Sequence, residues 1–296
     1  MLNNIRALFP GLEVRENEPL KNHTSFRIGG PADVMLLPKT AEELTDVYKA
    51  LLKMDVRPFV MGNGSNLLFA DEGYRGVVIK TSGMNGLSLA AENVIRAGSG
   101  ALLSQTAVFA RKNSLAGMEF AHGIPGSVGG AIMMNAGAYG GEMKDITVKT
   151  AYLDASGKMC EVSGEEHEFS YRHSRFQPGE IVLYSEFSLK PGAEAEIQER
   201  MSGLAAKRTA SQPVEMPSAG SAFKRPAGGF AAALIDQAGL KGLSVGGAQV
   251  SPKHAGFIVN TGGATCADVL ALIDKVKEAV FRASGIELEP EIRVVR

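Results

Sequence analysis

Two glycine-rich loops decide the fold of this chain, and the first reads Gly62-Asn63-Gly64-Ser65-Asn66-Leu67-Leu68. The second reads Gly123-Ile124-Pro125-Gly126-Ser127-Val128-Gly129-Gly130 and continues through Gly137 to Gly140. A backbone without Cβ atoms can approach a ligand closely and turn its N–H groups toward phosphate oxygens. Two such loops in separate parts of the chain predict a long, phosphate-bearing cofactor that is held at both ends.

Neither loop is specific by itself. The first lacks the lysine of a Walker A motif, and Leu67 occupies the place of the last glycine in G-x-G-x-x-G. Taken alone, it is as typical of a tight turn between two strands as of a phosphate site. The second loop has six glycines from Gly123 through Gly140 and no charged residue, a content that favours binding over a purely structural role.

Length, charge and cysteine content narrow the class of protein. A chain of 296 residues predicts two or three domains, and its net charge of −1 gives no electrostatic reason to bind nucleic acid or a membrane surface. Only Cys160 and Cys266 are present, Met1–Pro10 lacks a signal-peptide pattern, and no apolar run approaches the roughly 20 residues of a membrane helix. The histidines and cysteines show no metal-ligand spacing. We therefore expect a cytoplasmic protein without membrane insertion or a metal site.

The hydrophobic periodicity predicts an α+β protein. Thr40 and Glu43 have the spacing of a capping box ahead of a helix that ends before Pro58, and the spacing of Thr265 and Asp268 predicts the start of another. Further helices are expected at 102–112, 197–208, 230–238 and 265–283, and strands at 59–61, 77–79, 94–96, 181–184, 256–259 and 289–295.

The segment Tyr171-Arg172-His173-Ser174-Arg175-Phe176 places two guanidinium groups among aromatic rings. Arg172 and Arg175 in this setting favour a clamp for a carboxylate or phosphate, because the planar guanidinium fork matches both anions. A solvated strand edge is the alternative, and His173 fits either interpretation.

Two further segments carry candidate acids. Ser221 follows Gly220 and stands close to two cations, and a serine beside positive charge donates a proton more readily. No G-x-S-x-G elbow surrounds it, which disfavours a nucleophilic serine, and a plain serine-rich loop stays open. Glu289 and Glu291 share a face if they lie in a strand, either as an acid pair or as solvated charges where the strand begins.

Several segments together, in their order along the chain, are similar to one flavoenzyme family. They are residues 23–32, 62–68, 123–140, 171–176, 220–226, 249–256 and 289–291. With them the chain resembles the UDP-N-acetylenolpyruvoylglucosamine reductase (MurB) family of peptidoglycan precursor synthesis. The direct Tyr-Arg-x-Ser-Arg-Phe form resembles its shorter type II branch, which lacks an inserted tyrosine loop over the substrate.

The resemblance implies a fold and a cofactor. The fold is the FAD-binding fold of the vanillyl-alcohol-oxidase (PCMH) type, with subdomains at 1–80 (joined by the terminal strand 291–296) and 81–207, followed by a substrate-binding domain at 208–290. FAD is implied to bind non-covalently. The implied cofactor contacts are Arg27, Gly62, Asn63, Gly64, Ser65, Asn66, Gly123, Ile124, Pro125, Gly126, Ser127, Gly130 and Gly137.

The resemblance also implies a reaction, the reduction of UDP-N-acetylglucosamine enolpyruvate to UDP-N-acetylmuramate with NADPH as hydride donor. Matched residue by residue, Arg172 and Glu291 stabilise enolate-like charge, and Ser221 protonates the carbon next to the one that receives hydride. Ala222 stands where many relatives carry a larger residue, so we expect it to change the shape of the pocket. The implied substrate contacts are Arg175, Lys224, Arg225 and Gln249.

Two alternatives share the glycine loops. One is a different flavin oxidoreductase of the same fold, such as an oxidase of a small alcohol. Such an oxidase would not need a group that donates a proton to carbon, which is the role that the pair Ser221 and Glu291 suggests. A non-catalytic nucleotide-binding module is the alternative from another class, and a colourless protein that cannot be reconstituted with FAD would favour it. The sequence predicts no oligomeric state.

Overall fold

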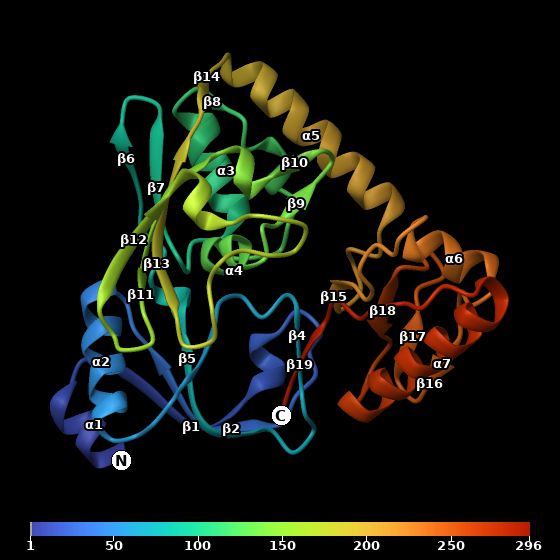
Figure 1. Cartoon of the computed structure of the whole chain (residues 1–296), viewed down its shortest axis with the longest axis horizontal. Helices are drawn as coiled ribbons and strands as arrows, with labels where there is room; N and C mark the ends of the chain where they lie inside the picture. Colours follow the sequence, from blue (N-terminus) through green and yellow to red (C-terminus); the bar gives the residue numbers. More distant parts are fainter. Residues whose placement is uncertain (1) are drawn as a thin grey trace. The chain divides into compact units, whose positions relative to one another are not determined.

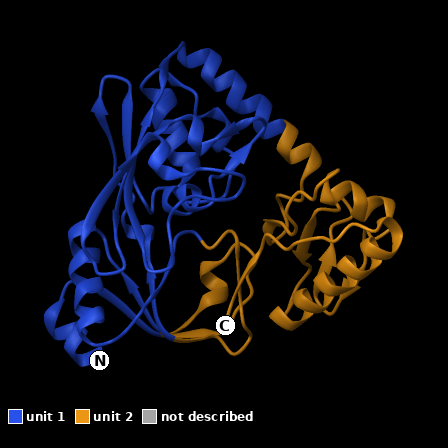
Figure 2. Ribbon diagram, in the orientation of Figure 1, with its two compact units in different colours: residues 1–16, 34–63, 76–206 blue, residues 17–33, 64–75, 207–296 orange. Residues whose placement is uncertain are grey.

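The computed structural model describes residues 2–296, which form two compact units (Figures 1 and 2). Unit 1 comprises the residues up to Glu16, Val34–Asn63 and Gly76–Ala206, whereas unit 2 comprises Asn17–Asp33, Gly64–Arg75 and Lys207–Arg296. The chain therefore passes from one unit to the other several times, and one of these crossings falls inside the first glycine loop.

The elements of the first two thirds of the chain are α1 (Leu2–Leu8), β1 (Glu13–Pro19), β2 (Pro31–Leu37), α2 (Ala41–Lys53), β3 (Phe59–Met61), β4 (Leu67–Phe69), β5 (Tyr74–Lys80), β6 (Leu87–Ala91), β7 (Val94–Gly98), α3 (Leu103–Lys112), β8 (Leu115–Ala116), α4 (Val128–Met133), β9 (Gly137–Ala138), β10 (Gly141–Glu142), β11 (Thr147–Leu153), β12 (Met159–Ser163), β13 (Ile181–Ser188) and β14 (Lys190–Pro191). They are followed by α5 (Glu194–Ser211), β15 (Ser218–Ser221), α6 (Ala231–Gln237), β16 (Ser244–Val245), β17 (Ala248–Val250), β18 (Phe257–Asn260), α7 (Cys266–Ser284) and β19 (Arg293–Val295). Short 3-10 helices lie at Leu20–His23, Thr81–Gly83, Glu119–Ala121, Met143–Asp145 and Gly164–His167.

The predicted helix starts are confirmed where a side chain caps the backbone locally. At α7, Thr265 and Asp268 form the expected capping box, and Gly285 ends the helix with φ of 71°. At α2, Thr40 Oγ1 accepts from the N–H of Glu43 at 3.1 Å, but the Glu43 carboxylate turns back to Lys39 N instead of Thr40 N. Each bond satisfies one of the N–H groups that a helix start leaves without an intrahelical partner.

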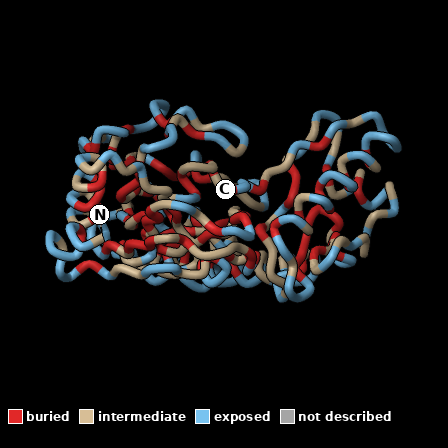
Figure 3. The backbone as a smooth tube through the Cα atoms, turned by 90° about the horizontal axis from the view of Figure 1, so that it is seen from below, coloured by how far each residue is buried: buried red, intermediate tan, exposed pale blue. Residues whose placement is uncertain are grey.

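A five-stranded antiparallel sheet with the order β12-β11-β13-β7-β6 is the centre of unit 1 (Figure 1). Helix α4 packs on β13 and β7, and the helix α3 shares the same apolar core through Leu103, Ala107 and Ala110. A second core in unit 1 lies around the buried face of α2, formed by Leu44, Val47, Tyr48 and Leu51. Buried residues concentrate inside the units and exposed residues on loops and outer helix faces (Figure 3).

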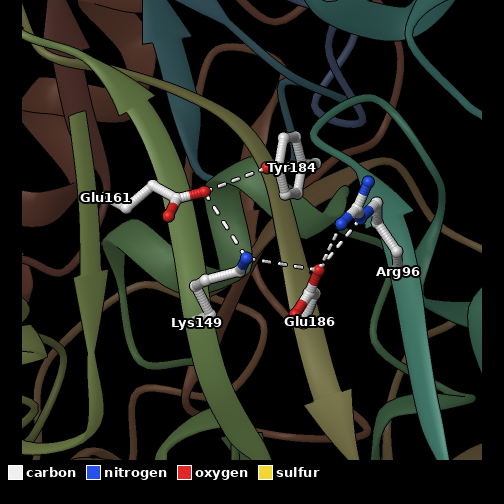
Figure 4. A network of polar contacts seen from close by, with 5 residues as sticks. All are labelled: Arg96, Lys149, Glu161, Tyr184 and Glu186. Atoms are coloured by element: carbon white, nitrogen blue, oxygen red, sulfur yellow. Dashed lines mark hydrogen bonds and ion pairs between the residues drawn. The ribbon is translucent and has the colours of Figure 1, made fainter. Parts of the chain in front are cut away.

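Cross-strand charges stabilise the register of this sheet on a polar face (Figure 4). Arg96 of β7 lies opposite Glu186 of β13, and their side chains form an ion pair of 2.7 Å. Lys149 of β11 lies between two carboxylates, 3.7 Å from Glu186 and 3.4 Å from Glu161. The Tyr184 ring packs under the Arg96 guanidinium at 4.6 Å. Opposite charges on directly facing positions favour this pairing over a shifted one.

Unit 2 contains a four-stranded antiparallel sheet with the order β15-β18-β17-β16, on which α7 packs. Its core also takes in Phe26, Ile28 and Leu68 from the N-terminal quarter of the chain. β19 pairs in parallel with β4, with Val294 opposite Leu68. Burial of these side chains explains why short N-terminal segments fold with the C-terminal part of the chain.

Among residues 2–296, no helix has both the length and the hydrophobicity that crossing a membrane requires. The same residues include no group of three or more His, Cys, Asp or Glu side chains placed to hold a metal ion.

Candidate active site

Within unit 1, the first two residues of the first glycine-rich loop, Gly62 and Asn63, lie against the second loop. Asn63 Nδ2 donates a hydrogen bond of 2.6 Å to the carbonyl of Pro125, which ties the tip of the first loop to the second. A Cβ atom at Gly62 would collide with the hydroxyl of Ser127, so a larger residue at this position requires the Ser127 side chain to move. Loops that are distant in the sequence thus form one structure.

A third segment completes this arrangement. The N–H of Val128 donates to Ala101 O and the N–H of Gly129 to Ser99 O, both at 2.8 Å. A Cβ atom at Gly129 would lie 3.0 Å from the Cβ of Ser99, which explains the glycine there. The name glycine cradle is used below for residues 62–63, 99–101 and 125–129.

The glycine cradle contains two buried hydroxyl groups without a hydrogen-bond partner among the described residues, those of Ser99 and Ser127. Their residues are 1% and 2% exposed. A buried hydroxyl that makes no hydrogen bond costs free energy, so it indicates a place where a polar partner belongs. A glycine-rich backbone and two hydroxyl groups that lack partners are features expected of a site for an extended ligand with phosphate oxygens, such as FAD.

Other residues expected to contact the cofactor have different surroundings. In unit 2, the N–H of Ser25 donates to Gly64 O at 3.4 Å, so the segment that carries the exposed Arg27 lies beside the second half of the first loop. In unit 1, a Cβ at Gly137 would lie 2.7 Å from Glu142 Cγ. The pairing of β9 with β10 therefore already requires a glycine at position 137, whether or not this residue contacts the cofactor.

The structure brings Ser221 and Glu291 onto adjacent backbone segments of unit 2. The N–H of Glu291 donates to Ala222 O at 2.9 Å, and Phe223 pairs with Pro290 in an isolated bridge. Gly220 has φ of 77°, within the register shift between Ser218 and Ser221 on β15, and such a bulge changes the direction of the following side chain. The side chain of Ser221 is exposed.

The first glycine loop also contacts this pair of segments. Asn66 Nδ2 donates to the carbonyl of Glu291 at 3.2 Å, and Asn66 O accepts from the N–H of Arg293 at 3.0 Å. The position of the Glu291 backbone therefore depends on Asn66, which is expected to contact the cofactor.

Two expectations for this region are wrong. The terminal strand begins at Arg293 and not at Glu289, so Glu289 and Glu291 lie before it, on either side of Pro290, which pairs with Phe223 only in an isolated antiparallel bridge. Ala222 does not line a pocket, since it is fully buried in the apolar core of unit 2. A larger residue at Ala222 would change the packing of that core.

Arg172 lies in a tight turn and not at a strand edge. Ser170 and His173 exchange backbone hydrogen bonds of 3.1 and 3.2 Å across this turn, and Arg172 has φ of 54°. Its guanidinium carbon lies 5.2 Å from the centre of the Tyr171 ring. A residue other than glycine in the left-handed region is uncommon and costs energy, and such positions are frequent at functional sites.

The residues expected to contact substrate each have partners within their own unit. Arg175 donates to the Tyr152 hydroxyl at 2.7 Å, and this bond raises the pKa of its guanidinium. Lys224 forms an ion pair of 2.5 Å with Glu289, and Arg225 lies 4.4 Å from the centre of the Phe230 ring. Gln249 Nε2 donates to Ser244 Oγ at 3.0 Å and to Gly242 O at 3.3 Å.

Two buried polar residues near the Arg172 turn were not among the residues predicted from the sequence. Asn135 and His167 are both fully buried. The available signal for Asn135 was a single polar residue that follows the apolar run Ile132-Met133-Met134. His167 offered none, because its environment is formed by Thr150 and Phe169 of the folded chain: its Nε2 lies 3.0 Å from Thr150 Oγ1, and its ring stacks on Phe169.

His167 gives the protein a predictable pH dependence. Burial lowers the pKa of His167, so the native state holds it neutral while the unfolded state takes up a proton. The contribution of neutral, buried His167 to the free energy of unfolding is fully present above pH 6.5, about the pKa of histidine in the unfolded chain, and it is lost as the pH falls below that value. The thermal midpoint of His167→Gln is therefore expected to fall less steeply with acidification than that of the wild type. Burial also lowers the pKa of His254, so the thermal midpoint of the His167→Gln variant still falls with acidification, though less steeply.

Thermal unfolding followed by circular dichroism from about pH 7.5 to about pH 5.5 measures this difference. The exposed His173→Gln variant is the control. Parallel pH slopes for wild type and His167→Gln would contradict the prediction.

Comparison with known families agrees with the geometry. A family model described as an FAD binding domain matches residues 32–163, which include both glycine loops. The C-terminal domain model of UDP-N-acetylenolpyruvoylglucosamine reductase matches residues 212–295. The fold and the glycine cradle, with these matches, define an FAD-dependent oxidoreductase, and the expected α+β, PCMH-type FAD-binding fold is confirmed.

Relatives that match nearly the whole chain give the family. The UDP-N-acetylenolpyruvoylglucosamine reductase of Caldanaerobacter subterraneus is 49% identical and covers 94% of this chain and 92% of its own length. That of Agathobacter rectalis is 47% identical, with coverage of 99% and 98%. The crystal structure of the Thermus caldophilus enzyme (MurB) has a TM-score of 0.83 at 37% identity, covering 96% of this chain and 99% of that one. The chain belongs to the UDP-N-acetylenolpyruvoylglucosamine reductase family.

Proposed function

We propose that this protein reduces UDP-N-acetylglucosamine enolpyruvate to UDP-N-acetylmuramate with NADPH, in the cytoplasmic synthesis of peptidoglycan precursors. The observation that carries the proposal is the glycine cradle, in which Asn63 bonds to Pro125 and two buried serine hydroxyls have no partner among residues 2–296. Membership of the family supplies the substrate class, a UDP-sugar that carries an enolpyruvyl ether.

The cradle residues are proposed to hold FAD non-covalently. The contacts come from Gly62, Asn63 and Ser127 and their neighbours on both loops, with Gly64, Ser65, Asn66 and Arg27 contributing from the adjoining segments. When bound, FAD would accept a hydride from NADPH and supply it to the methylene carbon of the enolpyruvyl group. The proposed domain division is 1–80 with 291–296 and 81–207 for FAD, and 208–290 for the substrate. The FAD-binding match at 32–163 and the C-terminal match that begins at 212 support the boundary near residue 208.

Three residues are proposed to act on the substrate. Arg172 places its guanidinium at the enolpyruvyl carboxylate and stabilises the negative charge that develops there, because a fixed cation costs no reorganisation during the reaction. Ser221 donates the proton to the carbon next to the carboxylate. Glu291 acts with Ser221, and the backbone bond from Glu291 N to Ala222 O keeps the two on neighbouring segments. Lys224, Arg225, Gln249 and Arg175 are proposed to contact the UDP-sugar.

The two half-reactions, followed separately by anaerobic stopped-flow absorbance, test this function. We expect purified protein to be yellow, its flavin to be bleached by NADPH, and the colour to return when the enolpyruvyl UDP-sugar is added. A colourless protein that FAD does not reconstitute would indicate a nucleotide-binding module instead. A flavin that is reduced by a small alcohol and ignores the UDP-sugar would indicate an oxidase of the same fold.

A further inference from the structure

We propose that Asn135 is a positioning residue for Arg172, because its carboxamide ties the turn that carries this arginine to the segment that follows the glycine cradle. The inference rests on the catalytic role proposed for Arg172. It adds a residue that does not contact the reacting atoms but fixes the arginine that does.

The carboxamide of Asn135 is buried, and its three hydrogen bonds reach two other segments of unit 1, residues 142–144 and the turn at Ser170. Its Nδ2 donates to Ser170 O and to Glu142 Oε2, both at 3.0 Å, and its Oδ1 accepts from the N–H of Lys144 at 3.0 Å. The residue is 0% exposed and has φ of 39°. Asparagine is among the few residues that adopt this backbone conformation readily, so the position suits both its side chain and its backbone.

The contact at Ser170 is the one that reaches Arg172. Ser170 begins the tight turn in which it exchanges two hydrogen bonds with His173, and Arg172 lies inside that turn at positive φ. A second bond, from Ser174 Oγ to Met133 O at 3.0 Å, ties the far side of the turn to the same segment. Both ends of the turn are therefore fixed to residues 133–135.

The same short segment leads directly from the glycine cradle. Helix α4 begins after Ser127 of the cradle and ends at Met133, and Asn135 follows two residues later. The N–H of Ala136 bonds back to Ala131 O at 2.9 Å, which joins Asn135 to the helix end. A displacement of the helix therefore moves the Arg172 turn with it, and the arginine keeps its place relative to the cofactor loops.

Glu142 adds an electrostatic contribution. The pKa of the Glu142 carboxyl is lowered by its hydrogen bonds with Lys144 and Asn135 and by the charge of Arg172, which together outweigh the opposing effect of burial. The carboxylate is therefore ionised at neutral pH and attracts the Arg172 guanidinium, while Asn135 holds one of its oxygens. Asn135 thus fixes both the backbone of the turn and a negative charge near its arginine.

Replacing Asn135 by Asp tests this role. The aspartate retains the size, the tolerance of positive φ and the acceptor for Lys144 N, but it loses both N–H donors. We expect unchanged flavin content and unchanged reduction by NADPH, with reoxidation by the enolpyruvyl UDP-sugar slowed about 10- to 100-fold, because a 1 Å misplacement of a catalytic group costs about that much. Asn113→Ser, which removes a single amide bond to Phe109 O at the end of α3, is the matched control and should retain both rates.

A double-mutant cycle separates positioning from general support of the fold. If Asn135 acts through Arg172, Asn135→Asp should slow reoxidation in the wild type but add little in an Arg172→Ala background. Equal slowing of both half-reactions, or losses that add in the double variant, would overturn the inference. Should Asn135→Asp fail to fold, Ser174→Ala removes the second tie and must show the same selective loss. A wild-type protein whose reduced flavin ignores the UDP-sugar would overturn the proposed function instead.

Discussion

Ser221→Ala is expected to leave flavin reduction by NADPH unchanged while slowing reoxidation by the enolpyruvyl UDP-sugar about 100- to 10,000-fold, the usual contribution of a general acid. The physical reason is that only the second half-reaction requires a proton on carbon. Gly220, at φ of 77°, and the bulge on β15 direct the Ser221 side chain, so alanine at 221 removes the hydroxyl without disturbing the backbone.

Anaerobic stopped-flow of the two half-reactions gives both rates for the Ser221 variant. Ser218→Ala is the matched control, because Ser218 lies on the same strand and pairs with Val259 of β18. If Ser221→Ala slows both half-reactions equally, or neither, then Ser221 is not the proton donor.

Gly62→Val is expected to yield a folded protein that purifies without flavin. A Cβ atom at Gly62 already meets the Ser127 hydroxyl, and the two further methyl carbons of valine would fill the glycine cradle itself. We expect the Ser127 side chain to be displaced and the contact between the two loops, which includes the bond from Asn63 to Pro125, to be weakened. We expect FAD affinity to fall at least 100-fold, a cost of about 3 kcal/mol, in the range for forcing extra carbons into a packed site.

The ratio of absorbance at 450 nm to that at 280 nm and titration with FAD measure this loss. Gly86→Val is the control, since a Cβ at this exposed glycine of unit 1 meets nothing within 4 Å. Full flavin content in purified Gly62→Val, or equal loss in Gly86→Val, would show that the cradle does not hold the cofactor.

Local signals in the sequence were reliable guides to the elements. The helix start at Thr265 and Asp268 was predictable because its bonds join residues three positions apart. The strand Phe257–Asn260, expected at 256–259, was predictable for a similar reason, since a short continuous apolar run is a local property of the sequence. The helices α1 and α4 were missed, as α4 has only six residues and two of its positions are glycine.

Features that depend on distant partners escaped the sequence. The strand expected from residue 289 begins only at Arg293, and the Glu291 N–H before it bonds to Ala222 O, a residue from another part of the chain. A strand edge was one of the two expectations for Arg172, but the bonds of Ser170 to His173 and to Asn135 place this residue in a tight turn at positive φ. In both cases a long-range hydrogen bond overrides the local preference.

The sequence by itself determined the α+β class, the family and the identity of the glycine loops, because glycine content, helix caps and segment order are properties of the linear chain. Only the tertiary structure decided that Asn63 bonds to Pro125, that Gly62 leaves room for Ser127, and that residues 17–33 and 64–75 pack with the C-terminal part of the chain. The physical reason is that burial of apolar side chains and completion of buried hydrogen bonds join segments without regard to their distance in the sequence.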